Sequence, residues 1–429
     1  MNQHLHGKKI ATRRPATQNA RSRTGSLLLA VCLFFTLISS GCTSLPASPA
    51  TSGQPETGGT SAVASETVQV SAPTPVSTPA ASIEATPAST PTPKPTKPPR
   101  PEMSATPEPD RKETRLPFSR GINLGNCLEA PLEGAWGLVI QDEWMQVIRS
   151  AGFDHIRLPV RWTAYASVTE PYTLDERFLS RVDHVIDTAL KADLGVVLNV
   201  HNYTEMATEP EENLPRIAGI WKQLAKHYKD LPENVAFELM NEPNGAADAV
   251  WPEMSDKLYD VVRKADPDRW ICITNGSWSA AGTLVNLVLP ERILKDPKVF
   301  ATFHFYEPFH FTHQNANWVA GSDAWAGTTW DGNTSQQAFV TDLYNGVSKW
   351  SKKNGGMPVL MGEFGAYSAC DPLSRVRWTE FCAREAERHG FAWTYWEFAS
   401  GFGIYGKNSK KFDMPLLKAL IPETVIPAK

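Results

Sequence analysis

The chain has 429 residues, of which 34 are Pro and 14 are Trp, and its formal net charge at pH 7 is −4. These totals conceal an acidic body: residues 116–429 carry 30 Lys and Arg against 39 Asp and Glu, together with every Trp and Tyr of the chain. This body lacks the clustered positive charge that phosphate binding needs, so the composition excludes a typical nucleic-acid-binding protein. Its 314 residues suit one large domain or two smaller ones.

The first 42 residues have the composition of a targeting segment. Six basic side chains and no acidic one precede a 12-residue apolar run, residues 27–38, which is too short to span a bilayer as a helix. The run ends in SSGC at residues 39–42, which resembles a bacterial lipobox, although Ser39 stands where Leu is usual. We expect a lipoprotein-type signal peptide over residues 1–42 and a lipid anchor at Cys42. Plain secretion and an uncleaved N-terminal anchor are the alternatives, and each of the three would place the body outside the cell.

Residues 43–115 form a second segment of different composition. It contains 15 Pro up to Asp110, is otherwise rich in Thr, Ser and Ala, and has no aromatic residue. Such a sequence cannot bury enough apolar surface to offset the entropy of ordering, so we expect a disordered linker that is partly polyproline II. A long spacer behind a lipid anchor would hold the domain 116–429 away from the cell surface, which suits a bulky or insoluble partner.

The four cysteines of the body are Cys127, Cys272, Cys370 and Cys382. They show no CxxC pairing and no His at zinc-site spacing, so we expect no metal site. Free, mostly buried thiols are the preferred interpretation. A disulfide between Cys370 and Cys382 is the alternative, since sequence spacing does not determine the geometry that a disulfide needs.

From residue 118 onward, eight short apolar or β-branched runs alternate with amphipathic stretches. Several runs show no apolar–polar alternation, which is typical of parallel strands covered on both faces. Eight such units in about 300 residues match a (β/α)8 barrel, which typically needs ~250 residues or more. The predicted strands are Phe118–Leu124, His155–Val160, Gly195–Val200, Val235–Met240, Trp270–Thr274, Val299–Phe305, Pro358–Gly362 and Phe391–Trp396. The predicted helices are Asp142–Ser150, the stretch that follows Asp175, Ile217–Tyr228, Met254–Lys264, Gln337–Lys352 and Ser374–Arg388.

Polar residues cluster at the C-terminal end of nearly every predicted strand. In a parallel barrel these ends converge on one mouth, whereas a doubly wound open sheet would spread them along an edge. The pattern therefore favours the barrel and indicates a single pocket. The residues are Asn123, Asn126, Arg157, His201, Asn202, Asn241, Glu242, Asn275, His304, Tyr306, Glu363, Trp396 and Glu397.

Two of these residues, Glu242 and Glu363, follow the fourth and the seventh predicted strand. Hydrolysis of a glycosidic bond needs one acid to protonate the departing oxygen and a second carboxylate across the sugar ring. Opposite sides of a barrel mouth can place two carboxyl groups ~5–5.5 Å apart, the separation that a retaining mechanism needs. A strand-end Glu can also form a simple salt bridge with a loop Lys or Arg. Two of them, beside Asn, Arg, His and Tyr, favour a glycosidase.

The neighbouring side chains have physical roles in such a site. Arg157 would keep a nucleophilic carboxylate ionised, and Tyr306 would donate a hydrogen bond to the same group. His304 would tune the acid, Asn241 would bind the sugar 2-OH, and Trp396 would offer a flat apolar face to a pyranose ring. Each of these residues has an equally good structural explanation when it is considered alone, so the prediction depends on their combination.

Seven segments of the body resemble glycoside hydrolase family 5, and in particular its bacterial endo-β-1,4-glucanase branch, some of whose members also cleave mannan. They are GINLGNCLEAP, HIRLPVRW, VVLNVHNY, AFELMNEP, ATFHFYEPFHFTHQ, VLMGEFGAY and WTYWEF. The resemblance spans about residues 116–425 and implies a (β/α)8 barrel, a retaining mechanism and no cofactor. It makes Glu242 the acid/base and Glu363 the nucleophile. It places Arg157, His201, Asn241, His304, Tyr306 and Trp396 around them, and it has Asn126, Glu129, His313 and Trp318 contact the glucan further out.

One position departs from the family pattern, because His201 is followed by Asn202 where these enzymes usually carry a second His. Asn still donates and accepts hydrogen bonds but cannot be protonated, so we expect catalysis to survive while the preference between glucan and mannan stays open. A β-mannanase or xyloglucanase is the alternative with the same chemistry. A non-catalytic polysaccharide-binding lipoprotein would lack one of the glutamates, and a solute-binding protein would show two similar lobes. We expect a monomer whose partner is a β-linked polysaccharide.

Two further patterns have alternative explanations. Residues 401–406 match the dinucleotide motif GxGxxG, but only 23 residues follow and they contain no convincing strand to complete a βαβ unit. We therefore expect these glycines to turn the last loop beside the sugar site. Trp325 and Trp330 are either outer sugar platforms or anchors of their loop.

Overall fold

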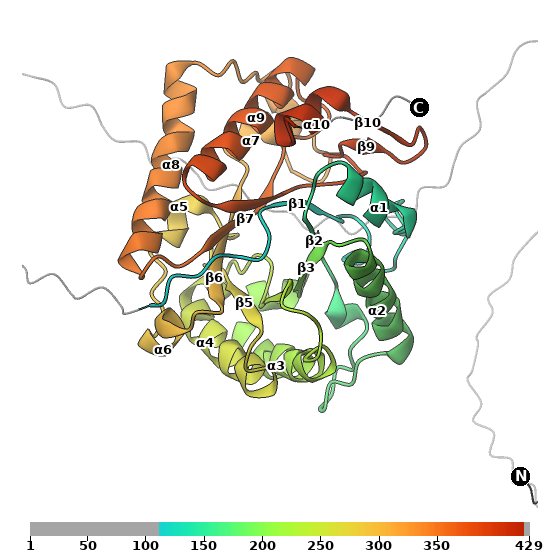
Figure 1. The fold of residues 1–429 in the computed structure, drawn as a ribbon, viewed down its shortest axis with the longest axis vertical. Helices are drawn as coiled ribbons and strands as arrows, with labels where there is room; N and C mark the ends of the chain where they lie inside the picture. The colour runs from blue at the N-terminus through green and yellow to red at the C-terminus, as the bar shows by residue number, and fades with distance from the viewer. Residues whose placement is uncertain (1–110, 424–429) are drawn as a thin grey trace, which may run out of the picture. The chain divides into compact units, whose positions relative to one another are not determined.

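The computed structural model describes residues 111–423, and their eight longer strands close into a parallel barrel in chain order (Figure 1). The predicted (β/α)8 barrel is confirmed, and every predicted strand overlaps an observed one. The strands are β1 (Arg120–Asn123), β2 (His155–Leu158), β3 (Gly195–Asn199), β4 (Val235–Glu238), β5 (Trp270–Ile273), β6 (Val299–Phe305), β7 (Val359–Phe364) and β8 (Ala392–Tyr395). The predicted signal peptide, the predicted lipid site at Cys42 and the predicted linker up to residue 110 lie outside the described residues.

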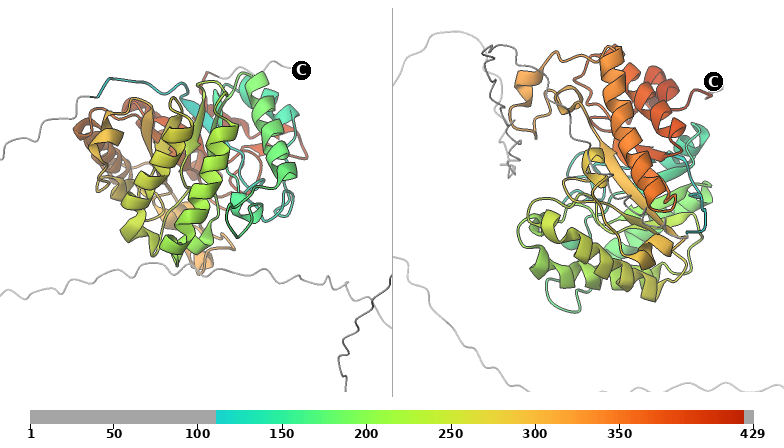
Figure 2. Two further views of the ribbon diagram at one scale, coloured as in Figure 1. Left: turned by 90° about the horizontal axis from the view of Figure 1, so that it is seen from below. Right: turned by 90° about the vertical axis from the view of Figure 1, so that its left-hand side faces the viewer.

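The longer helices surround the barrel, as Figure 1 and the turned views of Figure 2 show. All six predicted helices are present, although α3 and α4 begin about seven residues earlier than their apolar periodicity indicated. Among residues 111–423, no helix has both the length and the apolar character that a membrane crossing requires. The helices are α1 (Glu143–Ser150), α2 (Glu176–Lys191), α3 (Pro210–His227), α4 (Ala247–Ala265), α5 (Ala281–Leu284), α6 (Glu291–Lys295), α7 (Phe309–Thr312), α8 (Thr334–Lys353), α9 (Pro372–Arg388) and α10 (Met414–Leu420).

Short elements complete the loops. Three 3-10 turns lie at Trp162–Ala164, Thr204–Ala207 and Ser322–Trp325. After β8, a small antiparallel hairpin pairs β9 (Tyr405–Gly406) with β10 (Lys411–Phe412). The expectation that no strand follows Gly406 is therefore wrong for β10. Its two residues are too few to leave a periodic pattern in the sequence. The GxGxxG residues lie in the loop and hairpin after β8, and no parallel strand follows them within the described chain.

The alternation of side chains along each strand separates two apolar clusters. The larger one lies between strands and helices, and the smaller one contains Phe118 and strand residues such as Ala236 and Phe300. Successive residues of a strand point to opposite faces, so Glu238 shares the face of Ala236 and points into the barrel, away from the helix-facing Phe237.

The chain contacts the barrel before β1 begins. The buried guanidinium of Arg111 donates to the backbone oxygens of Leu294 and Val299, and the hydroxyl of Thr114 donates to Pro297 O over 3.0 Å. These contacts place the start of the folded body a few residues before the predicted boundary at residue 116. The cysteines 127, 272, 370 and 382 are free and buried, as the preferred interpretation of the sequence held.

Candidate active site

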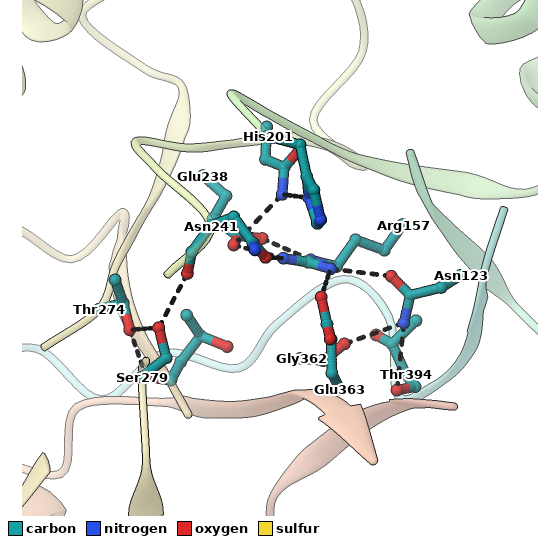
Figure 3. A network of polar contacts seen from close by, with 12 residues as sticks. Asn123, Arg157, His201, Glu238, Asn241, Thr274, Ser279, Gly362, Glu363 and Thr394 are labelled. Atoms are coloured by element: carbon teal, nitrogen blue, oxygen red, sulfur yellow. Dashed lines mark hydrogen bonds and ion pairs between the residues drawn. The ribbon is translucent and has the colours of Figure 1, made fainter. Parts of the chain in front are cut away.

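The C-terminal strand ends bring charged side chains from three strands, β2, β4 and β7, to one point (Figure 3). Arg157 comes from β2, Glu238 from β4 and Glu363 from β7, while Glu242 lies four residues after Glu238 in the loop that leaves β4. Arg157 is the centre of this group: its Nη1 lies 2.6 Å from Oε1 of Glu363, and its Nε and Nη2 each lie 2.7 Å from an oxygen of Glu238. The structure therefore assembles the residues that the polar strand ends predicted, with Glu238 added.

Local backbone geometry brings β6 and β7 into register at the site. Phe303 on β6 pairs with Met361 on β7, but the next residue, His304, pairs with Glu363. The register therefore skips Gly362. A bulge of this kind re-aims the side chains beside it. A Cβ at Gly362 would lie 2.6 Å from Oγ1 of Thr302, so only glycine fits at this position without displacing β6.

The two candidate catalytic carboxylates lie close together. One ligand atom each of Glu242, His304 and Glu363 lies within 4.8 Å of the other two. The hydroxyl of Tyr306 donates to Oε2 of Glu363 over 2.8 Å, and Nδ1 of His304 lies 2.6 Å from Oε1 of Glu242. A closest approach of the two carboxyl groups within 4.8 Å is compatible with the ~5–5.5 Å separation of retaining glycosidases and shorter than the ~6.5–9.5 Å of inverting enzymes.

Burial and neighbouring charges give the two carboxyl groups different environments. Desolvation raises the pKa of Glu242 to about 7, with Arg157 opposing the rise and Glu238 adding to it. Burial also raises the pKa of Glu363, but His304, Arg157 and the Tyr306 hydroxyl act in the opposite direction. Burial lowers the pKa of His304 to about 4, so this imidazole is neutral near pH 7. Glu242 is thus suited to carry a proton, while Glu363 has the contacts that stabilise an anion.

The trio of Glu242, His304 and Glu363 is also where three potential metal ligands converge in the part of the chain that the structure describes. However, the guanidinium of Arg157 lies 2.6 Å from Glu363, and its positive charge opposes a second cation at this point. The arrangement is better suited to proton transfer and nucleophilic attack than to metal binding.

Asn241, His201 and Trp396 line the same mouth. Oδ1 of Asn241 accepts a hydrogen bond from Nη2 of Arg157 over 2.7 Å, and its backbone oxygen accepts one from Ser279. The rings of His201 and Trp396 stack with 5.9 Å between their centroids and 11° between their planes. Burial, followed by the nearby Arg157 charge, lowers the pKa of His201, so this ring is neutral as well. These contacts hold two flat rings and an amide beside the carboxylate pair.

Several residues that were predicted to lie further from the two catalytic carboxyl groups form hydrogen bonds that order the loops of the barrel mouth. The side chain of Asn126 donates to Oγ of Ser400, and that of Asn202 donates to the backbone oxygen of Glu129. Glu129 is 1% exposed and accepts hydrogen bonds from the backbone N–H groups of Asn126 and Cys127, while burial raises its pKa to about 8. The structure therefore places the Glu129 carboxyl inside its own loop, rather than on an open surface.

Glu397, which follows β8, braces its loop in a similar way. It is buried and accepts hydrogen bonds from the backbone N–H groups of Ala399, Ser400 and Phe402. Burial raises its pKa to about 7 against these hydrogen bonds. The two buried carboxyl groups thus hold the loops that follow β1 and β8.

The aromatic residues after β6 differ in exposure. His313 is buried and packs against Tyr306 and Phe309, whereas Trp318 is 47% exposed and lies edge-on to Tyr367. Trp330 is 2% exposed and packs on Phe381, which makes it an anchor of its loop. Trp325 is partly exposed and stacks on His310 with 4.2 Å between the ring centroids.

The sequence reasoning missed Glu238 in this site and Trp278 beside it. Glu238 is a carboxylate within the apolar strand VAFE, and this mismatch was the signal that could have identified it. Trp278 is 46% exposed in the loop after β5, and its backbone N–H donates to Pro243 O, next to Glu242. Its position depends on Ser277, Trp278 and Ser279 all having positive φ angles, of 56°, 55° and 58°, which no sequence pattern indicates for these residue types.

Comparison with known proteins identifies relatives with the same architecture. The family model "Cellulase (glycosyl hydrolase family 5)" matches residues 119–401. Endoglucanase H of Acetivibrio thermocellus is 35% identical over 315 residues, which cover 72% of this chain but 33% of that protein. The chain likewise spans 35% of a second relative, the cellulase/esterase CelE of the same organism, so it corresponds to about a third of the length of these two proteins.

Solved structures give a closer match over nearly their full length. Thermotoga maritima Cel5A in complex with cellobiose is 43% identical with a TM-score of 0.69, and the match covers 71% of this chain and 97% of that one. The same enzyme in complex with mannotriose gives 43% identity, a TM-score of 0.68 and the same coverage. The matched family model and these relatives show that the chain belongs to glycosyl hydrolase family 5, the cellulase family.

Proposed function

We propose that this protein is a retaining endo-β-1,4-glucanase in which Glu242 is the acid/base and Glu363 the nucleophile. The observation that carries the proposal is that an oxygen of Glu242 and an oxygen of Glu363 lie within 4.8 Å of each other. Glu242 lies beside the neutral His304, and Glu363 lies beside Arg157 and the hydroxyl of Tyr306. The relatives named endoglucanase support a glucan substrate and favour it over the mannanase alternative.

The first half of the reaction forms a covalent intermediate. A carboxylate oxygen of Glu363 attacks the anomeric carbon, the bond from that carbon to the glycosidic oxygen breaks, and Glu242 transfers its proton to the departing oxygen. The pKa of Glu242, raised by burial to about 7, supports its role as the proton donor near neutral pH. Arg157 and Tyr306 stabilise Glu363 as an anion before the attack.

The second half releases the sugar with retained configuration. Glu242, now ionised, removes a proton from a water molecule, whose oxygen attacks the same anomeric carbon, and the bond to Glu363 breaks. Two displacements on one carbon restore the original configuration, and the two carboxyl groups return to their starting charges. No step requires a cofactor.

The surrounding residues are proposed to hold the glucan chain. Asn241 is placed to bind the 2-OH of the sugar at the cleavage point, and the Trp396 face, stacked on His201, would support its ring. His304 and Tyr306 would act through the carboxylates that they contact. Asn126, Asn202, Glu129, His313 and Trp318 are proposed to shape the outer part of the groove, with Trp318 providing an exposed aromatic surface.

The N-terminal segments fit an extracellular enzyme that is tethered to its cell. We propose that residues 1–42 direct export, that Cys42 carries a lipid, and that the Pro/Thr-rich linker extends to about residue 110 before the catalytic domain, which acts as a monomer. A Cys42→Ser variant should move from the membrane fraction into the medium, whereas a variant that stays with the membrane would contradict lipidation at Cys42.

The test of activity compares the full chain with its Glu363→Ala variant on carboxymethyl-cellulose, mixed-linkage β-glucan and galactomannan. Reducing ends and viscosity are followed together, because an endo-acting enzyme lowers viscosity early. Rapid loss of viscosity on the glucans, absent in the variant, is the expected result. Comparable rates on galactomannan would make the enzyme bifunctional, and activity only on decorated chains would identify a xyloglucanase. Binding without hydrolysis of any of these polymers would overturn the proposal in favour of a binding protein.

A further inference from the structure

Arg157 has all five of its N–H donors occupied by four side chains (Figure 3). Nε and Nη2 donate to the two oxygens of Glu238, each over 2.7 Å, and Nη2 also donates to Asn241 over 2.7 Å. Nη1 donates to Asn123 over 2.9 Å and to Glu363 over 2.6 Å. A guanidinium offers five N–H groups in one plane, so this set of contacts fixes both its position and its rotation.

Glu238 accepts two of these hydrogen bonds, while each of the other three side chains accepts one. Neither side chain of the Arg157–Glu238 pair has exposed surface, and the pair is bidentate, so two parallel hydrogen bonds determine the plane of the guanidinium. Once that plane is set, Nη1 points at Glu363. If Glu238 were removed, Arg157 could rotate about its side chain and its N–H group would no longer be directed at the nucleophile.

Glu238 also balances the charge of Arg157. Besides Glu363, five titratable groups interact with this pair: His201 after β3, Cys272 on β5, His304 and Tyr306 at the end of β6, and Glu242 after β4. Burial keeps the two His, the Cys and the Tyr neutral near pH 7, and it favours the protonated form of Glu242. The charges at the centre are therefore those of Arg157, Glu238 and Glu363. Without the negative charge of Glu238, the full positive charge of Arg157 would act on both catalytic carboxyl groups.

We propose that Glu238 is a positioning residue of the catalytic centre, which aims Arg157 at Glu363 and offsets its charge so that Glu242 keeps its proton. This inference rests on the proposed roles of Glu242 and Glu363. Glu238 touches neither the substrate nor the reacting atoms, and it acts through the guanidinium. An offset charge also leaves Glu363 a stronger nucleophile than it would be beside an unbalanced cation.

Two variants of the full chain separate the two effects. Glu238→Gln keeps the shape but removes the charge, so both limbs of the pH profile of kcat/KM should move to lower pH by about one unit. Glu238→Asp keeps the charge but shortens the reach to Arg157. It should lower kcat roughly 10- to 100-fold through misplacement of the guanidinium, with the pH limbs unchanged.

A matched control comes from the opposite end of the barrel. Asp266 and Arg269 form another buried ion pair, whose side chains are 6% and 3% exposed, at the N-terminal side of β5. Asp266→Asn should lower the unfolding temperature, as loss of a buried ion pair does, but leave the pH profile of kcat/KM at its wild-type position. A Glu238→Gln variant that behaves like this control would show that Glu238 is merely structural and would overturn the inference.

A second measurement does not depend on catalysis. The pKa values of Glu242 and Glu363 can be followed by NMR titration of 13C-labelled Glu side chains in wild type, Glu238→Gln and Glu238→Asp. A downward shift of both pKa values in Glu238→Gln, and no such shift in Glu238→Asp, is the expected result. If the wild type hydrolysed no glucan, the proposed function would fail while this titration still tested Glu238. If Glu238→Gln did not fold, Glu238→Asp with wild-type kcat would overturn the positioning role.

Discussion

Single residues set the protonation states on which the proposed reaction depends, and Glu363 allows the most direct test. Glu363→Ala should lose nearly all turnover, since no other carboxylate of the site is held by both Arg157 and Tyr306. The cavity left by the side chain would admit azide, which should restore part of the activity on activated aryl glycosides and give a product of inverted configuration. Product analysis by NMR checks the stereochemistry, and an absence of rescue at high azide would argue against Glu363 as the nucleophile.

Glu242 should determine the alkaline limb of the pH profile. Burial raises its pKa to about 7, and the proposed acid must be protonated, so kcat/KM should fall as the pH rises through about 7. In Glu242→Ala this limb should disappear. Hydrolysis of substrates with poor leaving groups should drop by about 10²–10⁴-fold, far more than that of activated aryl glycosides. Equal losses on both substrate types, or an unchanged alkaline limb, would remove Glu242 from the acid role.

At the scale of elements, the sequence predicted the parts whose pattern is repeated over several residues. The strands could be predicted because runs such as Val299–Phe305 are largely apolar. The long helices could be predicted because their apolar residues recur at helical spacing. The four- and five-residue helices α5, α6 and α7 are too short to show a period. The left-handed turn at residues 277–279 was not predictable, because it depends on tertiary contacts with the β4 loop rather than on its own residue types.

That left-handed turn is held by Asp248 from the start of α4, which gives a test of its role. The Asp248 carboxylate accepts hydrogen bonds from the backbone N–H and the hydroxyl of Ser277, over 2.6 and 3.3 Å. Asp248→Ala should cost about 1 kcal/mol of unfolding free energy, because these bonds are partly exposed to solvent. If the turn presents Trp278 to the glucan, KM for long glucans should rise while kcat on short aryl glycosides changes little. A similar KM in Trp278→Ala would support this, and wild-type KM values in both variants would exclude the turn from the groove.

At the scale of the whole molecule, the barrel made the site predictable in outline. Polar residues about 240 positions apart in the sequence, such as Asn123 and Glu363, share one network through Arg157 because parallel strand ends meet at one mouth. The contact of Arg157 with the nucleophilic carboxylate was predicted and is present at Glu363, but the choice of Glu238 as its bidentate partner was not predictable. That choice depends on side-chain geometry inside the barrel, which only the folded structure specifies.

The opposite end of the barrel should affect stability without affecting catalysis. Phe118, just before β1, joins the inner apolar cluster and lies 4.5 Å from the ring of His155 and 6.1 Å from that of Phe300, while Arg111 donates to backbone oxygens beside β6. Phe118→Ala should lower the free energy of unfolding by about 3–5 kcal/mol, and Arg111→Ala by about 1.5–3 kcal/mol. Both should keep the wild-type kcat and pH profile at temperatures where they are folded, because the proposed chemistry lies at the C-terminal strand ends. Denaturant unfolding and glucan hydrolysis measured on the same samples check the separation. A loss of kcat in the folded Phe118→Ala variant would contradict this separation. It would mean that a change of packing in the inner cluster displaces Arg157 and its partners, because the cluster and these side chains both lie inside the barrel.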